Sequence, residues 1–306
     1  MAKVNPDFRE CAGSYIFLVS ACVASTSRPG AASPANPNYP PTRPPELSLA
    51  NPGAPLELRT AFTSAPGNGI QVALASGGVI LGSSDGQAWS RAWQAKAPLY
   101  AITYGNGMFV AVGYGGTILV SADGLKWTSR SSGTCSSLHS VAHGQGTFVA
   151  VGNEGLIVTS ADATNWFGQK SGTDERLRGV VYGQGVFAAV GYNGTVLTSK
   201  DGVRWTRRDS GIEDRLRGID FSNGLFVATG WHGLVLTSKD GVYWKTRSSF
   251  QEDLDPVANR GGVCTTSGPS SPESFRGASS AASGWFREES STDFLAATAP
   301  TSKPRW

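Results

Sequence analysis

Residues 199–205 read Ser-Lys-Asp-Gly-Val-Arg-Trp, and this seven-residue motif recurs along the chain at a nearly constant interval. Its closing tryptophans are spaced by 38, 39, 39 and 39 residues. A period near 40 residues predicts a repeat architecture in which each unit buries its apolar faces against its neighbours. The five copies place aspartates at Asp85, Asp123, Asp162, Asp201 and Asp240, and tryptophans at Trp89, Trp127, Trp166, Trp205 and Trp244.

One period contains four short runs that are typical of strands. In the fourth copy these are residues 177–182, 186–190, 195–199 and 204–208, separated by glycine-containing turns. The second run is apolar without alternation, which indicates burial on both faces, and the fourth is polar, which suits an outer edge. The sequence therefore predicts an all-β propeller with four-stranded blades of about 39 residues each.

The chemistry of the motif explains its residue types. An aspartate that opens a hairpin can accept hydrogen bonds from backbone N–H groups of its own turn, and the glycine takes a positive φ. The tryptophan is expected to fold over the hairpin and pack against the next blade. The third copy, residues 160–166, has Ala163 where the others have glycine.

These copies resemble the Asp-box of the BNR-repeat propellers over residues 67–249. That group includes sialidases and many non-enzymatic exported proteins, among them photosystem II assembly factors of the Ycf48 type. The usual box has one more residue between the aspartate and the aromatic residue. The resemblance therefore implies the propeller architecture and not a particular family.

The blade count is less plain than the repeat. Five clear blades span residues 61–253, and residues 254–290 predict a degenerate sixth blade with Trp285 as its displaced tryptophan. We expect a closed-ring propeller over residues 56–290 and a tail over residues 291–306. Residues 265–306 contain no clear Asp motif and could instead be disordered or out of frame, so counts from five to seven blades stay open.

The amino terminus has the pattern of an export signal. Residues 1–22 combine Lys3 and Arg9 with an apolar stretch, and residues 19–22 (Val-Ser-Ala-Cys) resemble a bacterial lipobox, which predicts acylation of Cys22. Plain secretion, or no export, are the alternatives. Residues 23–55 hold nine of the 17 prolines and predict an extended spacer. The expected location is the cell envelope, by a lipid anchor, or outside the cell.

Composition excludes several classes of protein. The 39 glycines and 17 prolines exclude a helix bundle, because both residue types destabilise helix interiors. A net charge of +3 is too small to supply the clustered positive potential on which nucleic-acid binding depends. No CxxC spacing occurs and the only histidines are His139, His143 and His232, so neither a metal nor a cofactor is expected. If Cys22 is acylated and Cys11 is removed with the signal, only Cys135 and Cys264 remain, and because they fall in non-neighbouring units both are expected to be free thiols.

Strand direction predicts two different faces. Turns such as residues 105–107 and the Asp-Gly turns should form one uniform face, whereas the opposite face should carry loops that differ between copies. The candidate partner-binding residues lie on this second face or at the start of the inner strands. They are Tyr100, Tyr114, His139, Glu154, Arg178, Tyr192, Arg217, Trp231 and His232. Alternatively, these side chains only pack and solvate that face.

No catalytic constellation accompanies the repeat. A sialidase-like hydrolase would need a third in-phase arginine, and the repeat supplies only Arg178 and Arg217 at matching positions. The sequence favours a monomeric, non-catalytic propeller that binds a protein or peptide as a scaffold or assembly factor. Glycan binding through Tyr114, Tyr192 and Trp231 is an alternative, and glycoside hydrolysis a more distant one.

Overall fold

The computed structural model describes residues 61–86, 88–249, 258–260, 263–268, 271–278 and 286–287. The expected signal, spacer and tail, including Cys22, lie outside these residues. No helix in the described part of the chain is long and apolar enough to span a membrane.

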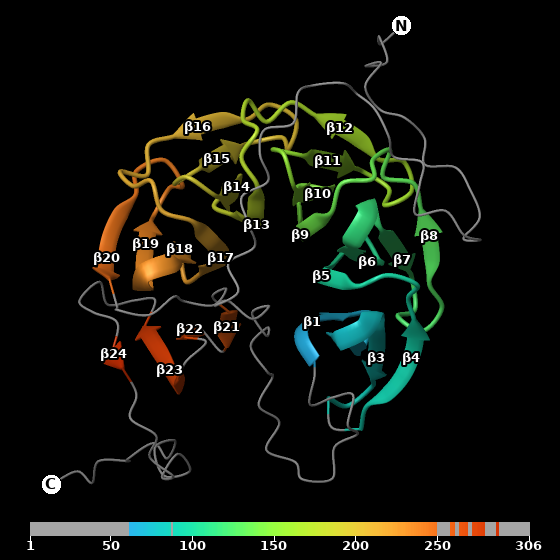
Figure 1. Cartoon of the computed structure of the whole chain (residues 1–306). Coiled ribbons are helices and arrows are strands. Elements are labelled where there is room, and N and C mark those ends of the chain that lie inside the picture. Colours follow the sequence, from blue (N-terminus) through green and yellow to red (C-terminus); the bar gives the residue numbers. More distant parts are fainter. Residues whose placement is uncertain are drawn as a thin grey trace, which may run out of the picture.

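The strands form six four-stranded antiparallel sheets, each made from consecutive strands (Figure 1). Sheet 1 contains β1 (Ala61–Gly67), β2 (Ile70–Ala75), β3 (Val79–Ser83) and β4 (Ser90–Gln94). Sheet 2 contains β5 (Leu99–Gly105), β6 (Met108–Gly113), β7 (Ile118–Ser121) and β8 (Thr128–Arg130). Sheet 3 contains β9 (Leu138–Gly144), β10 (Thr147–Gly152), β11 (Ile157–Ser160) and β12 (Phe167–Gln169).

The remaining sheets repeat this order. Sheet 4 contains β13 (Leu177–Gly183), β14 (Val186–Gly191), β15 (Val196–Ser199) and β16 (Thr206–Arg208). Sheet 5 contains β17 (Leu216–Ser222), β18 (Leu225–Gly230), β19 (Leu234–Ser238) and β20 (Lys245–Ser249). Sheet 6 contains β21 (Ala258–Arg260), β22 (Val263–Gly268), β23 (Ser271–Ala278) and β24 (Phe286–Arg287). Three short 3-10 turns, η2 (Ser76–Gly78), η3 (Tyr114–Gly116) and η4 (Trp231–Gly233), join second to third strands.

The sheets are arranged around a common centre, with the first strand of each innermost and the fourth on the periphery (Figure 1). Successive inner strands pack together, β1 with β5, β5 with β9, β9 with β13, β13 with β17 and β17 with β21. The expected fold class is confirmed, because the regular secondary structure of the described residues is strand apart from three short 3-10 turns, and each period makes one sheet.

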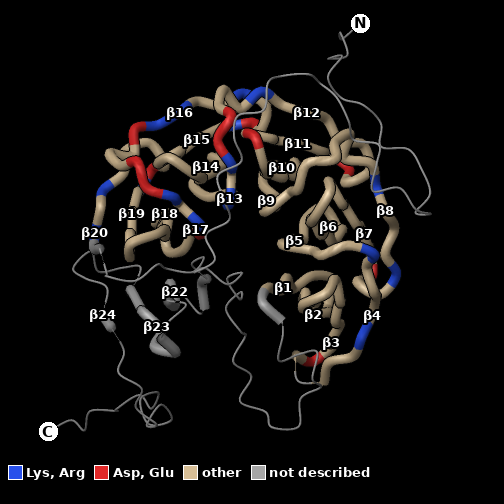
Figure 2. The backbone as a smooth tube through the Cα atoms, in the orientation of Figure 1, with Lys and Arg blue, Asp and Glu red and all other residues tan. Residues whose placement is uncertain are grey.

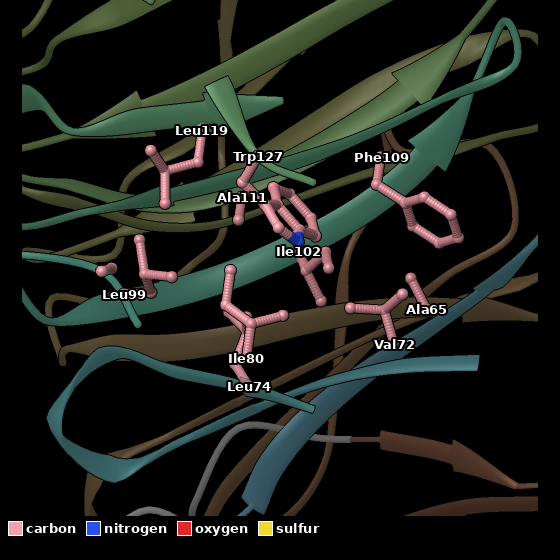
Figure 3. Close-up of a cluster of buried hydrophobic side chains, with 11 residues drawn as sticks. Ala65, Val72, Leu74, Ile80, Leu99, Ile102, Phe109, Ala111, Leu119 and Trp127 are labelled. Atoms are coloured by element: carbon pink, nitrogen blue, oxygen red, sulfur yellow. The ribbon is translucent and has the colours of Figure 1, made fainter. Parts of the chain in front are cut away.

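The core consists of layers between adjacent sheets. Between sheets 1 and 2, Val72, Leu74 and Ile80 pack against Phe109 and Trp127, as Figure 3 shows. The second strands are buried on both faces, since residues 109–113 of β6 are all buried. This double burial is the reason for their apolar sequence without alternation.

The repeated tryptophans pack in the direction opposite to the expected one. Trp127 of sheet 2 lies in the layer shared with sheet 1, and Trp166 of sheet 3 lies with Val110 and Val120 of sheet 2. Both tryptophans therefore pack against the preceding sheet and not the next. Each projects from the same face of its own sheet as the phenylalanine of the second strand, so Trp127 lies beside Phe109 and Trp166 beside Phe148. On sheet 1, Trp89 packs on the face turned away from sheet 2, which carries Ala73, Ala75, Val79 and Leu81.

Each Asp-Gly turn is closed by the same hydrogen bonds. In the fourth copy, Asp201 Oδ1 accepts from the backbone N–H of Val203 and Arg204 at 2.9 and 2.8 Å. Ser199 Oγ donates to Asp201 Oδ1 at 3.0 Å, and Trp205 Nε1 donates to the Gly202 carbonyl at 2.8 Å. Backbone donors hold the pKa of the carboxyls of Asp123, Asp162, Asp201 and Asp240 below its ordinary value.

Candidate binding face

Hydrogen bonds between turns define one face of the ring. Asn106, in the turn after β5, donates through Nδ2 to the carbonyls of Gly146 and Ala161 at 3.0 and 3.1 Å. Asn68 makes the equivalent bond to Ala122, beside the next Asp turn. The first turns and the Asp turns therefore share one face, which we call the uniform face.

The opposite face, called the variable face here, carries the turns after the second strands. Each turn is fixed by a bond to the connection that enters the same sheet: Tyr192 N donates to Arg176 O at 2.9 Å, and Trp231 N to Arg215 O at 3.0 Å. The glycine of these turns is obligatory, because a Cβ on Gly194 would lie 1.9 Å from the Ile212 carbonyl oxygen. The same backbone contact thus recurs in sheets 2 to 5, whereas the side chains on these turns differ.

An inner row of side chains begins at the second residue of each inner strand from β5 to β17. Tyr100 and His139 stack with ring centroids 5.6 Å apart, and Arg178 Nη1 lies 3.3 Å from His139 Nδ1. Arg217 follows in the next strand and is only 8% exposed. The structure thus brings together, in order, four of the residues that the sequence singled out.

Arg178 is a cation in a partly buried, cationic setting. Burial is the main cause that lowers its pKa, and Arg217 and Arg176 lower it further, whereas Tyr192 and Tyr100 act in the opposite direction. Within the described residues no carboxylate pairs with its guanidinium. Burial also raises the pKa of Tyr100, with the Arg178 charge opposing that shift.

A second row of side chains lies on the connections and turns of sheets 4 and 5. The Arg176 guanidinium lies 5.3 Å from the Tyr192 ring centroid, and the Arg215 guanidinium lies 4.7 Å from the same ring. Arg215 also lies 4.2 Å from the Trp231 ring. Cation–π contacts therefore link two arginines and two aromatic residues, and Arg215 joins sheet 5 to sheet 4.

Arg176 and Arg215 are site residues that the sequence analysis missed. The signal was present, because residues 175–179 read Glu-Arg-Leu-Arg-Gly and residues 214–218 read Asp-Arg-Leu-Arg-Gly, in phase with the repeat. The leucine points into the core while the flanking arginines reach the variable face.

The other candidate residues lie on the same face but make fewer contacts with the arginine rows. His232 Nδ1 is 3.1 Å from Asp214 Oδ1, and Tyr114 is 59% exposed. Glu154 is exposed and has a positive φ of 55°. Figure 2 shows Asp and Glu beside Lys and Arg at the connections that enter β13 and β17.

Within the described residues, no group of three His, Cys, Asp or Glu side chains is placed to hold a metal ion. Cys135 lies exposed in the connection between sheets 2 and 3 and is disulfide-bonded. The expectation of a free thiol at Cys135 was therefore wrong.

Comparisons with known proteins agree on architecture. No protein-family model matches the chain, and no curated protein matches it. Among solved structures, YCF48 bound to D1 peptide aligns with a TM-score of 0.59 at 15% identity, covering 82% of this chain and 88% of that chain. The chain is a β-propeller.

Two further structures resemble this propeller. YCF48 from Cyanidioschyzon merolae aligns with a TM-score of 0.52 at 17% identity, over 67% of this chain and 78% of that one. Virginiamycin B lyase from Staphylococcus aureus aligns with a TM-score of 0.61 at 12% identity, over 72% and 80%. At these identities the likeness is one of fold alone.

Proposed function

We propose that this propeller is a non-catalytic scaffold or assembly factor that holds an acidic protein or peptide segment across its variable face. The observation that carries the proposal is Arg178, a partly buried guanidinium with other arginines around it and no carboxylate partner among the described residues. Such a charge is costly to keep unless an anion completes the site. The solved complex of YCF48 with D1 peptide supports the use of this fold for peptide capture.

Peptide binding is favoured over glycan stacking by the cation–π contacts. The Tyr192 ring already carries the guanidiniums of Arg176 and Arg215, and Trp231 carries that of Arg215. A sugar would have to displace these cations, whereas a carboxylate can pair with N–H groups at the guanidinium edges. Tyr114 keeps an exposed ring and remains the best glycan candidate.

The test is fluorescence anisotropy with labelled hexaglutamate as the probe and hexalysine as the charge-reversed control. The double variant Arg178→Ala with Arg217→Ala should weaken hexaglutamate binding at least about tenfold, and its melting temperature is measured alongside because Arg217 is only 8% exposed. Lys126→Ala with Lys200→Ala removes the same charge from exposed Asp-turn positions and should leave binding nearly unchanged. Equal losses in the two double variants, or equal affinity for hexalysine, would refute the proposal.

We also propose that the protein is exported and anchored by acylation of Cys22. The disulfide at Cys135 supports export, because structural disulfides persist mainly in oxidising compartments. Fatty-acid labelling should be lost in Cys22→Ser. Peptide mapping without reduction provides a second test, since a Cys135–Cys22 disulfide would exclude a thioether at Cys22 and overturn the anchor.

A further inference from the structure

His139 sits at the meeting point of three elements at the centre of the ring. Its Nε2 lies 2.7 Å from Asn153 Oδ1 in the turn after β10, and its Nδ1 lies 3.3 Å from Arg178 Nη1 on β13. Its ring stacks on Tyr100 of β5. Every polar atom of the imidazole therefore has a defined partner.

The partners fix the proton on this ring. An arginine only donates hydrogen bonds, so Nδ1 must accept from Arg178. The Nε2–H must then donate to the amide oxygen of Asn153, which leaves a neutral Nε2–H tautomer. Burial lowers the pKa of His139 to about 4, the charge of Arg178 adds to this shift, the Asn153 bond opposes it, and Arg176 lowers the pKa a little more.

The turn that carries Asn153 is itself rigid. Asn153 N donates to the Ser137 carbonyl at 3.1 Å, and the Asn153 carbonyl accepts from Leu156 N at 2.9 Å. A chain of hydrogen bonds thus runs from the backbone of sheet 3 through Asn153 and His139 to the guanidinium of sheet 4. In a chain of this kind, each member orients the next.

We infer that His139 is a positioning residue: it is a neutral acceptor that holds the Arg178 guanidinium in one orientation for an anionic partner. This inference rests on the proposed function of the arginine rows. Fixing Arg178 before binding removes the cost of ordering a long side chain when the anion arrives. At the equivalent position of the inner strand before Arg217 the residue is Arg178 and not a histidine. Positioning of an arginine by a histidine is therefore specific to the junction between sheets 3 and 4.

A ligand-free experiment tests the coupling directly. Protein labelled with ¹⁵N-histidine should show His139 as the Nε2–H tautomer at pH 7, still neutral at pH 5. In Arg178→Gln the His139 signal should titrate at higher pH than in the wild type, because a neighbouring cation has been removed. A protonated or Nδ1–H imidazole at pH 7, or an unchanged titration in Arg178→Gln, would overturn the inference.

A matched pair of variants tests the consequence for binding. Asn and Leu have similar shapes, but only Asn keeps an acceptor near the position of Nδ1. His139→Leu should weaken hexaglutamate binding about tenfold, whereas His139→Asn should stay within about threefold of wild type. Equal losses in both would reduce His139 to a packing role and overturn the inference. If Arg178→Ala with Arg217→Ala leaves binding unchanged, the proposed function fails, and the titration experiment alone decides the role of His139.

Discussion

Removing one phased tryptophan tests whether the repeat reports a shared core. Trp166 is 9% exposed and lies between sheets 2 and 3, with its ring centroid 6.4 Å from that of Phe148. Its Nε1 donates to the Ala163 carbonyl at 3.1 Å. A buried aromatic side chain removes roughly 200 Å² from water, which is about 5 kcal/mol at 25 cal/mol/Å².

This figure is an upper estimate, because the unfolded chain already buries part of the side chain. We therefore expect Trp166→Ala to lower the free energy of unfolding by about 4 kcal/mol, in the range found for large aromatic residues cut to alanine. Urea unfolding followed by far-UV circular dichroism measures the loss.

The matched control is the next residue in the chain. Phe167 is 64% exposed at the start of β12, so Phe167→Ala should change stability by no more than about 0.5 kcal/mol. A Trp166→Ala loss below about 1 kcal/mol, or equal losses for the two variants, would refute the assignment of Trp166 to the inter-sheet core.

Two further perturbations follow from other contacts. A Cβ on Gly183 would lie 2.2 Å from Phe221 Cγ, so Gly183→Ala should cost about 2 kcal/mol in chemical denaturation, and an unchanged midpoint would contradict this packing. Burial lowers the pKa of His143 in the fold, and its buried Nε2 has no hydrogen-bond partner among the described residues. A depressed folded-state pKa gives stability that is complete above the unfolded value of about 6.5 and is lost as pH falls below it. His143→Phe should therefore reduce the loss of melting temperature between pH 7 and pH 5, and an identical loss in both proteins would count against it.

The fold was accessible from the sequence because turn chemistry is local. The spacing of Asp201 and Trp205 repeats wherever the chain makes the same hairpin, and the strands follow from the apolar runs between hairpins. The direction in which Trp166 packs was not accessible, because it depends on which face of a twisted sheet meets the preceding one.

The site was only partly accessible for a related reason. Repeat phasing found Arg178 and Arg217, since equivalent positions in a repeat share a place in the fold. It did not reveal that Arg215, which enters sheet 5, reaches back over Tyr192 of sheet 4. A contact between sheets depends on the sideways distance from one blade to the next, and the period of the sequence carries no information on that distance.

Because the repeated tryptophans pack against the preceding sheet, they also affect the order in which the chain can fold during synthesis on the ribosome. Each sheet that emerges brings the indole that completes the layer with the sheet already made, so assembly can advance from the amino-terminal end without waiting for the last blade. Sheet 1 is the first sheet of the described residues, and Trp89 packs on the face of its own sheet that is turned away from sheet 2. Among the described residues the layer around Trp89 draws on sheet 1 alone, so newly made chains held before release should expose this indole to a quencher while Trp127 is already protected.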